Sequence, residues 1–306
     1  MFDAHTAGVY VIAVTPFTDT GAIDSYSVDS MVDFYARCGA TGLTLLGMMG
    51  EAPKLTHDES IAVVRQVAKL TKLPVVVGVS APGFAPMAAL SRASMDAGAA
   101  GVMIAPVPTL KTDDQIVTYY RSVVEAIGPD IPFAIQDYPL STGVLFTPGV
   151  IKRIIEENPS CIMLKHEDWP GLEKITAIRR MISNGGLRQI SILCGNGGLF
   201  LPEEIGRGGD GAMTGYAFPE MLVSVTELIQ QSKRKEAHDL FDTHLPYLRY
   251  EQQAGIGLAV RKYVLKKRGA IASDTQRKPM AKLSPEAIVE IEWLLGRLVE
   301  RTGLKL

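Results

Sequence analysis

The sequence predicts an α/β fold, a (β/α)8 barrel, and three observations support this. The chain has 306 residues and is 47% hydrophobic, enough to bury one large core. Eight short apolar runs recur at a mean spacing of about 29 residues, and each is nearly continuously apolar, as parallel strands covered on both faces are. The segments between them carry apolar residues at helical spacing. The runs begin at Gly8, Gly42, Pro74, Gly101, Pro132, Cys161, Gln189 and Gly211.

Helix signals lie between the runs in the expected places. A helix that begins near Ser27 places Val28, Met31 and Val32 at helical spacing and ends at Gly39. Thr56 and Glu59, three residues apart, form a capping-box pattern. The pair Thr147–Pro148 puts proline at the first position of another helix. Eight alternating strands and helices with right-handed crossovers close naturally into a barrel.

The last part of the chain predicts helices only. About 90 residues follow Gly215, and the last helix opens at Ser284–Pro285. We therefore expect a barrel over residues 1–220 and a helical extension over 221–306 that packs on it. The alternative is an open doubly wound sheet, but residues 78–83 lack the G-x-G-x-x-G spacing and no Walker pattern occurs.

Composition argues against several classes of function. The 31 Lys+Arg against 33 Asp+Glu give a net charge of −2, which does not suit nucleic acid. The five histidines show no metal-ligand spacing, so we expect neither metal nor cofactor. No apolar stretch reaches the roughly 18 residues of a membrane span, and no signal peptide is expected. Cys38, Cys161 and Cys194 lie far apart without C-x-x-C, which favours a reducing cytoplasm.

The strongest candidate for catalysis is Lys165, at the end of the sixth apolar run. Active sites of such barrels lie at the carboxyl ends of the strands. Strand alternation puts Met163 and Lys165 on the same face. If that face points inward, poor solvation favours a neutral amine, which can attack a ketone and form a Schiff base. The alternative is a non-catalytic lysine, whose amine either extends to solvent at the rim of the barrel or forms an ion pair with Glu167 or Asp168.

Polar residues at the ends of the fifth and sixth runs lie where they could assist. Gln136 falls where an inward side chain is expected, and Tyr138 follows two residues later. Glu167 shares the face of Lys165 if the strand persists, and a carboxylate there suits proton transfer. A structural salt bridge is an equally good interpretation of Glu167.

Glycine-rich loops follow the second and seventh runs. They are Gly47-Met48-Met49-Gly50-Glu51 and Cys194-Gly195-Asn196-Gly197-Gly198. Glycines allow tight loops whose backbone N–H groups can bind an anion, although many turns contain glycine without such a role.

In order and spacing, these residues resemble a known family over essentially the whole chain. The matching pieces are Thr15-Pro16-Phe17, Gly47-x-x-Gly50-Glu51, Pro139…Thr142-Gly143, Lys165 and Gly195. They are similar to the dihydrodipicolinate synthase / N-acetylneuraminate lyase family of class I aldolases. The resemblance implies a Schiff base between Lys165 and a small 2-keto acid, with the 47–51 loop on the substrate carboxylate. It also implies a homotetramer.

The chain departs from the family pattern at positions that the synthase reaction uses. Met48 and Met49 stand where the family has two hydroxyl residues, and Gln136 stands in place of the strand-five tyrosine. Pro108 aligns with the tyrosine that a neighbouring subunit lends, and Ser141 with the arginine that grips a second carboxylate. These departures argue against dihydrodipicolinate synthase activity and favour a substrate with one carboxylate.

One branch of the family, the 2-keto-3-deoxy sugar-acid dehydratases that include those for L-2-keto-3-deoxyarabonate, resembles the chain at these positions too. The shared segments are Gln136-Asp137-x-Pro139, Lys165-x-Glu167, 211–215, 251–255 and 269–274. This resemblance implies that Lys165 condenses with the keto group, Glu167 removes a C3 proton and hydroxide leaves C4. We expect Gln136 to assist catalysis and the following residues to bind substrate: Gly47, Met48, Met49, Gly50, Tyr138, Gly195, Asn196, Met213, Thr214 and Tyr216.

Three other functions stay open at this point. A retro-aldolase would use the same iminium but release pyruvate and an aldehyde. A non-catalytic keto-acid-binding barrel would explain the missing tyrosines and loop hydroxyls. A metal-dependent class II aldolase fits least, because the histidines are wrongly distributed.

Overall fold

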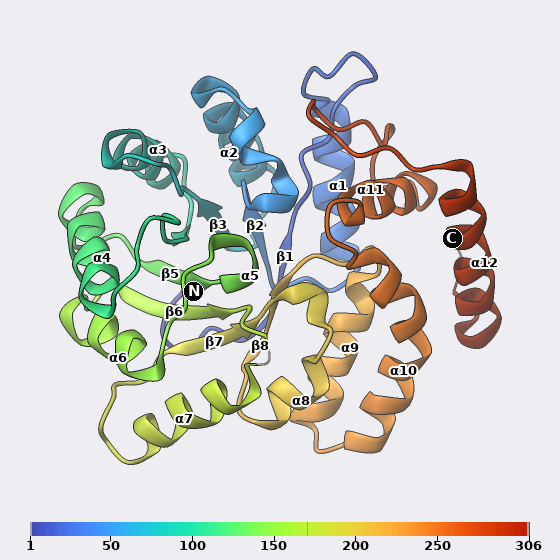
Figure 1. The fold of residues 1–306 in the computed structure, drawn as a ribbon. Helices are drawn as coiled ribbons and strands as arrows, with labels where there is room; N and C mark the ends of the chain where they lie inside the picture. The colour runs from blue at the N-terminus through green and yellow to red at the C-terminus, as the bar shows by residue number, and fades with distance from the viewer. Residues whose placement is uncertain (1, 170, 305) are drawn as a thin grey trace.

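Eight parallel strands close into a barrel in the computed structural model, which describes residues 2–169, 171–304 and 306 (Figure 1). Each strand pairs with its neighbours in sequence, and β8 pairs with β1 to close the ring. The predicted (β/α)8 barrel is confirmed. The strands are β1 Gly8–Ile12, β2 Gly42–Leu45, β3 Val75–Gly78, β4 Gly101–Ile104, β5 Phe133–Asp137, β6 Cys161–His166, β7 Ser191–Cys194 and β8 Gly211–Thr214.

Helices surround the barrel, and two of the predicted helix starts have the expected caps. Thr56 accepts a hydrogen bond from the Glu59 backbone and Glu59 accepts one in return, so the capping box is present. Thr147 caps the helix that opens with Pro148. The helices are α1 Ser25–Arg37, α2 His57–Leu70, α3 Phe84–Asp96, α4 Asp113–Ile127, α5 Pro139–Thr142, α6 Pro148–Glu157, α7 Leu172–Ser183, α8 Leu201–Gly206 and α9 Pro219–Gln230, with short 3-10 turns at Met48–Gly50, Ala52–Lys54 and Asn196–Gly198.

Three further helices form a layer outside the barrel wall. They are α10 Arg234–Glu251, α11 Gly257–Lys267 and α12 Pro285–Thr302. Figure 1 shows α10 on the outer side of α9 and α12 farther out. Helix α9 begins next to the predicted division at residue 220, yet it packs on β1 and α8 as the eighth helix of the barrel. The layer of the extension outside the barrel therefore consists of α10, α11 and α12.

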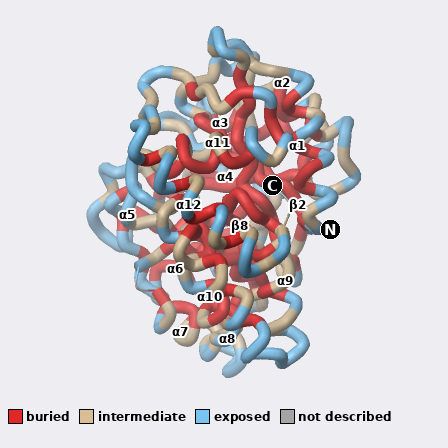
Figure 2. Tube along the Cα trace, turned by 90° about the vertical axis from the view of Figure 1, so that its right-hand side faces the viewer, coloured by how far each residue is buried: buried red, intermediate tan, exposed pale blue. Residues whose placement is uncertain are grey.

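The core has two parts, one inside the barrel and one between strands and helices. Figure 2 shows the buried segments in the middle of the molecule and the exposed segments around its edge. On β6, Met163 belongs to the inner cluster and Leu164 to the outer one. The next inward position is therefore Lys165. Phe2 lies against Gly101, at the amino ends of the strands, so the interior below Lys165 is filled.

Among the described residues, no helix is both long enough and apolar enough to span a bilayer.

Candidate functional site

A buried cluster of three polar side chains lies at the carboxyl ends of β5 and β6. Lys165 Nζ lies 2.9 Å from Glu167 Oε2, and Gln136 Nε2 donates a hydrogen bond of 2.8 Å to the same oxygen. Strand register places Gln136 directly beside Lys165. Only 4% of Lys165 is exposed to solvent. The amine and the carboxylate therefore form a buried ion pair that is shielded from solvent.

Of the two partners considered for Lys165, the structure pairs it with Glu167. The carboxylate of Asp168 instead lies 2.8 Å from Lys174 Nζ, which also contacts Asp137 at 2.6 Å. Lys165 does not reach the rim, because its side chain stays inside the barrel.

The loop after β7 encloses Glu167 from the other side. A Cβ added to Gly195 would lie 2.0 Å from Glu167 Cγ, so only glycine fits there. Asn196 Nδ2 donates to the Glu167 carbonyl at 2.9 Å, and the Asn196 backbone N–H approaches Oε1 at 3.5 Å. Gly195 and Asn196 therefore position the carboxylate.

A small pocket of about 90 Å³ opens above this cluster. Burial, together with the nearby charge of Glu167, raises the pKa of the Tyr138 phenol. The lining residues come from the ends of the strands and from the extension: Ile12, Met48, Met49, Gln136, Tyr138, Lys165, Glu167, Asn196, Gly197, Thr214, Gly215, Gln252 and Arg261.

The loop after β2 contributes thioethers to the pocket. Met48 and Met49 line it, and the Ser141 hydroxyl approaches Met48 Sδ at 3.4 Å. Gly47 and Gly50 do not line the pocket but shape the loop; the Gly50 carbonyl accepts a hydrogen bond of 2.6 Å from the Thr15 hydroxyl. The loop after β2 therefore contributes no hydroxyl group to this side of the pocket.

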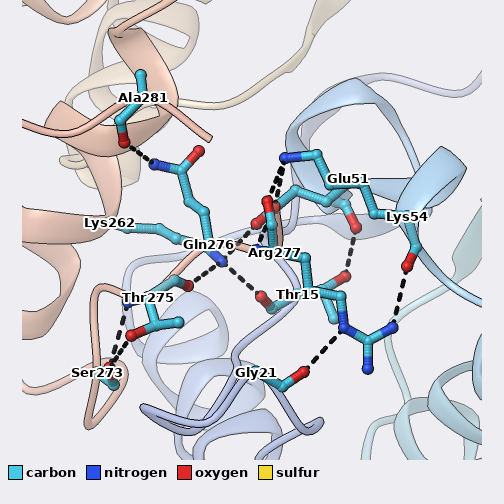
Figure 3. A network of polar contacts seen from close by, with 11 residues as sticks. Thr15, Gly21, Glu51, Lys54, Lys262, Ser273, Thr275, Gln276, Arg277 and Ala281 are labelled. Carbon is cyan, nitrogen blue, oxygen red and sulfur yellow. Dashed lines mark hydrogen bonds and ion pairs between the residues drawn. The ribbon is translucent and has the colours of Figure 1, made fainter. Parts of the chain in front are cut away.

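A buried ionic network fixes the same loop to the extension (Figure 3). Glu51, at φ 54°, lies 2.6 Å from Lys262 Nζ on α11 and 2.9 Å from Lys54 Nζ. Lys262 also donates to the carbonyls of Thr15 and Thr275, each at 2.8 Å. The Arg277 backbone N–H donates to Glu51 at 3.0 Å. Burial lowers the pKa of Lys262, while the Glu51 charge opposes that shift.

Of the predicted binding residues on and after β8, one lines the pocket and two do not. Thr214 lines it, and its hydroxyl accepts a hydrogen bond of 2.7 Å from the Gly197 backbone. Met213 lies in the packed barrel interior. The Tyr216 hydroxyl pairs with His244 Nδ1 on α10 at 3.1 Å, because alternation from inward Met213 puts Tyr216 on the outer face, in the core between strands and helices.

Five pocket residues were not predicted from the sequence: Ile12, Gly197, Gly215, Gln252 and Arg261. The last two come from the extension, where helix periodicity does not show that a side chain reaches the barrel mouth. The segment 251–255, which resembles the dehydratase branch, was the one signal near them.

Within the described part of the chain, no three histidine, cysteine, aspartate or glutamate side chains gather closely enough to hold a metal ion.

Comparison with known proteins decides the family. The family model described as the dihydrodipicolinate synthetase family matches residues 5–297. The chain belongs to this family. Members of the dihydrodipicolinate synthetase family are class I lyases, and the chain is therefore an enzyme of the lyase class.

Individual relatives carry two different activities in their names. The chain is 29% identical to an L-2-keto-3-deoxyarabonate dehydratase of Azospirillum brasilense, over 95% of this chain and 94% of the relative. It is 26% identical to a 4-hydroxy-tetrahydrodipicolinate synthase of Methanothrix thermoacetophila, over 97% of this chain and 98% of the relative. A crystal structure of dihydrodipicolinate synthase from Rhodopseudomonas palustris is 57% identical, with a TM-score of 0.96 over 97% and 99% of the two chains. These relatives do not settle the substrate.

Proposed function

We propose that the protein is a Schiff-base-forming dehydratase that acts on a 2-keto-3-deoxy sugar acid. The observation that carries the proposal is the buried contact of 2.9 Å between Lys165 Nζ and Glu167 Oε2 at the bottom of the pocket. A lysine amine next to a carboxylate is suited to form an iminium with a ketone and to move protons around it.

The first half of the reaction forms the iminium. A proton passes from Lys165 to Glu167, and the neutral amine attacks C2 of the keto acid. Glu167 then returns the proton to the carbinolamine hydroxyl, which leaves as water. The iminium is now the electron sink, and Glu167 is again a carboxylate.

The second half removes the elements of water from C3 and C4. Glu167 takes a proton from C3, which the iminium acidifies, and the electron pair forms an enamine. Glu167 then delivers that proton to the C4 hydroxyl, which leaves as water while the C3–C4 double bond forms. Hydrolysis of the iminium releases the dehydrated keto acid and restores Lys165. Gln136, which holds Glu167 by a hydrogen bond of 2.8 Å, keeps the carboxylate over these atoms.

Two features support dehydration over the synthase reaction. The pocket lacks the loop hydroxyls, which Met48 and Met49 replace, and Ser141 stands in place of the arginine for a second carboxylate. The A. brasilense dehydratase in the same family supports a sugar-acid substrate. The name of the 57% identical structure favours the synthase as the second candidate.

Product analysis by mass spectrometry tests the proposal. The enzyme is incubated with a panel of 2-keto-3-deoxy acids, and separately with pyruvate and aspartate semialdehyde; Lys165→Ala is the control. We expect a keto acid lighter by one water. Pyruvate plus an aldehyde would instead indicate a retro-aldolase, and consumption of pyruvate with the semialdehyde a synthase. Binding without turnover would indicate a keto-acid-binding barrel.

The homotetramer that the family resemblance implies also stays a prediction. Light scattering of the purified protein measures the number of chains in the assembly directly.

A further inference from the structure

Two hydrogen-bond donors in the pocket have no partner among the described residues. They are Nη1 of Arg261 and Nε2 of Gln252, both buried. Arg261 uses its Nε to donate to Glu251 at 2.6 Å, whereas Nη1 lies against Gly215, and Arg261 lines the pocket. A buried donor without an acceptor is costly, and such groups occur where a ligand supplies the acceptor.

The barrel makes room for both donors with glycine. A Cβ on Gly215, directly after β8, would lie 2.1 Å from Arg261 Nη1. A Cβ on Gly197, after β7, would lie 2.1 Å from Gln252 Nε2. Because both glycines also line the pocket, the two donors reach it from the extension across the ends of β7 and β8.

The position of Glu167 sets which end of the substrate meets these donors. One oxygen of Glu167 faces Lys165, and the other faces the Asn196 backbone after β7. A substrate with C2 on Lys165 and C3 at Glu167 therefore continues toward the ends of β7 and β8. Its carboxylate then faces the opposite side, at the loop that carries Met48 and Met49.

We propose that Arg261 Nη1 and Gln252 Nε2 bind the hydroxyl groups at the far end of the 2-keto-3-deoxy acid. This inference rests on the proposed function and deepens it. The charge of Arg261 is already balanced by buried Glu251, so the guanidinium offers N–H donors without a net charge for a second carboxylate. The two residues thus select substrates by the length and hydroxylation of the carbon chain rather than by a second charge.

Borohydride trapping tests this with two variants. Arg261→Lys keeps a cation beside Glu251 but withdraws Nη1, and Gln252→Met keeps side-chain length but removes the amide. Gln253→Met, at the exposed neighbouring position, is the matched control. The measured quantity is the keto-acid concentration that gives half-maximal inactivation by borohydride, for 2-keto-3-deoxy-L-arabonate, for 2-keto-3-deoxygluconate and for pyruvate, which lacks the far end.

We expect each variant to raise that concentration by about tenfold or more for the hydroxylated acids. The value for pyruvate should change by less than about twofold, as should every value of the Gln253→Met control. Equal changes for pyruvate and the hydroxylated acids, or no change, would overturn the inference alone. Tighter trapping of a keto acid with a distal carboxylate than of its hydroxylated counterpart would overturn the hydroxyl assignment. If wild-type protein forms no adduct with any of the acids, the proposed function fails as well.

Discussion

Replacing Lys262 with methionine probes how the extension fixes the loop after β2. The lysine is fully buried, and its ammonium contacts Glu51 and the carbonyls of Thr15 and Thr275. Methionine keeps most of the aliphatic volume but removes the charge and all three hydrogen bonds. Glu51 is then left buried with Lys54 as its remaining cation.

The expected cost follows from the burial of the pair. Removal of one partner of a buried ion pair costs about 3–5 kcal/mol, and the remaining contact with Lys54 puts the Lys262→Met loss near the lower end, about 3 kcal/mol. For a chain of 306 residues that loss lowers Tm by about 5 °C.

Thermal unfolding at one scan rate measures the effect, and the same helix supplies a control. Lys267 pairs with Glu292 at 2.6 Å, but both side chains are about one-third exposed. Lys267→Met should therefore cost less than about 1 kcal/mol. Equal Tm shifts for the two variants would refute the argument that the buried network anchors the loop.

Three further substitutions test the site and its surroundings. Glu167→Gln should lower kcat by about 10²–10⁴-fold, measured by product formation, because it removes the proton-transfer group; activity within about tenfold of wild type would contradict that role. Gly195→Ala should lower activity by at least about tenfold, since its Cβ would lie 2.0 Å from Glu167 Cγ, whereas Gly206→Ala has no atom within 4 Å and should be silent. Burial lowers the pKa of His244 from 6.5 to about 4. The unfolded chain therefore binds the extra proton between these values, and wild-type stability falls as pH drops through that window, by about 3 kcal/mol. His244→Gln can still accept a hydrogen bond from the Tyr216 hydroxyl. Its free energy of unfolding, measured by denaturant titration, should fall less than that of the wild type between pH 7 and pH 4. An equal fall in the two proteins would contradict this.

Local patterns account for the parts of the fold that the sequence predicted. Continuous apolar runs define buried parallel strands, and caps such as Thr56 with Glu59 define helix starts. Alternation along β6 put Met163 and Lys165 on one face, and the structure shows that this face points into the barrel, with Leu164 on the other.

Long-range packing accounts for the parts that could not be predicted. Arg261 on α11 and Gln252, directly after α10, line the pocket and lie against Gly215 and Gly197, and no local pattern encodes those contacts. Tyr216 shows the opposite case. Tyr216 lies three residues past inward-facing Met213, so strand alternation alone puts it on the outer face, and its ring packs against His244 on α10.

The most direct test of the central claim is the site of Schiff-base formation. Wild-type protein is treated with borohydride in the presence of pyruvate or a 2-keto-3-deoxy acid, digested, and mapped by mass spectrometry. We predict a reduced adduct on the peptide that contains Lys165 and none on that of Lys174, the neighbouring buried lysine. No adduct in the wild type, or full activity in Lys165→Ala, would contradict the account.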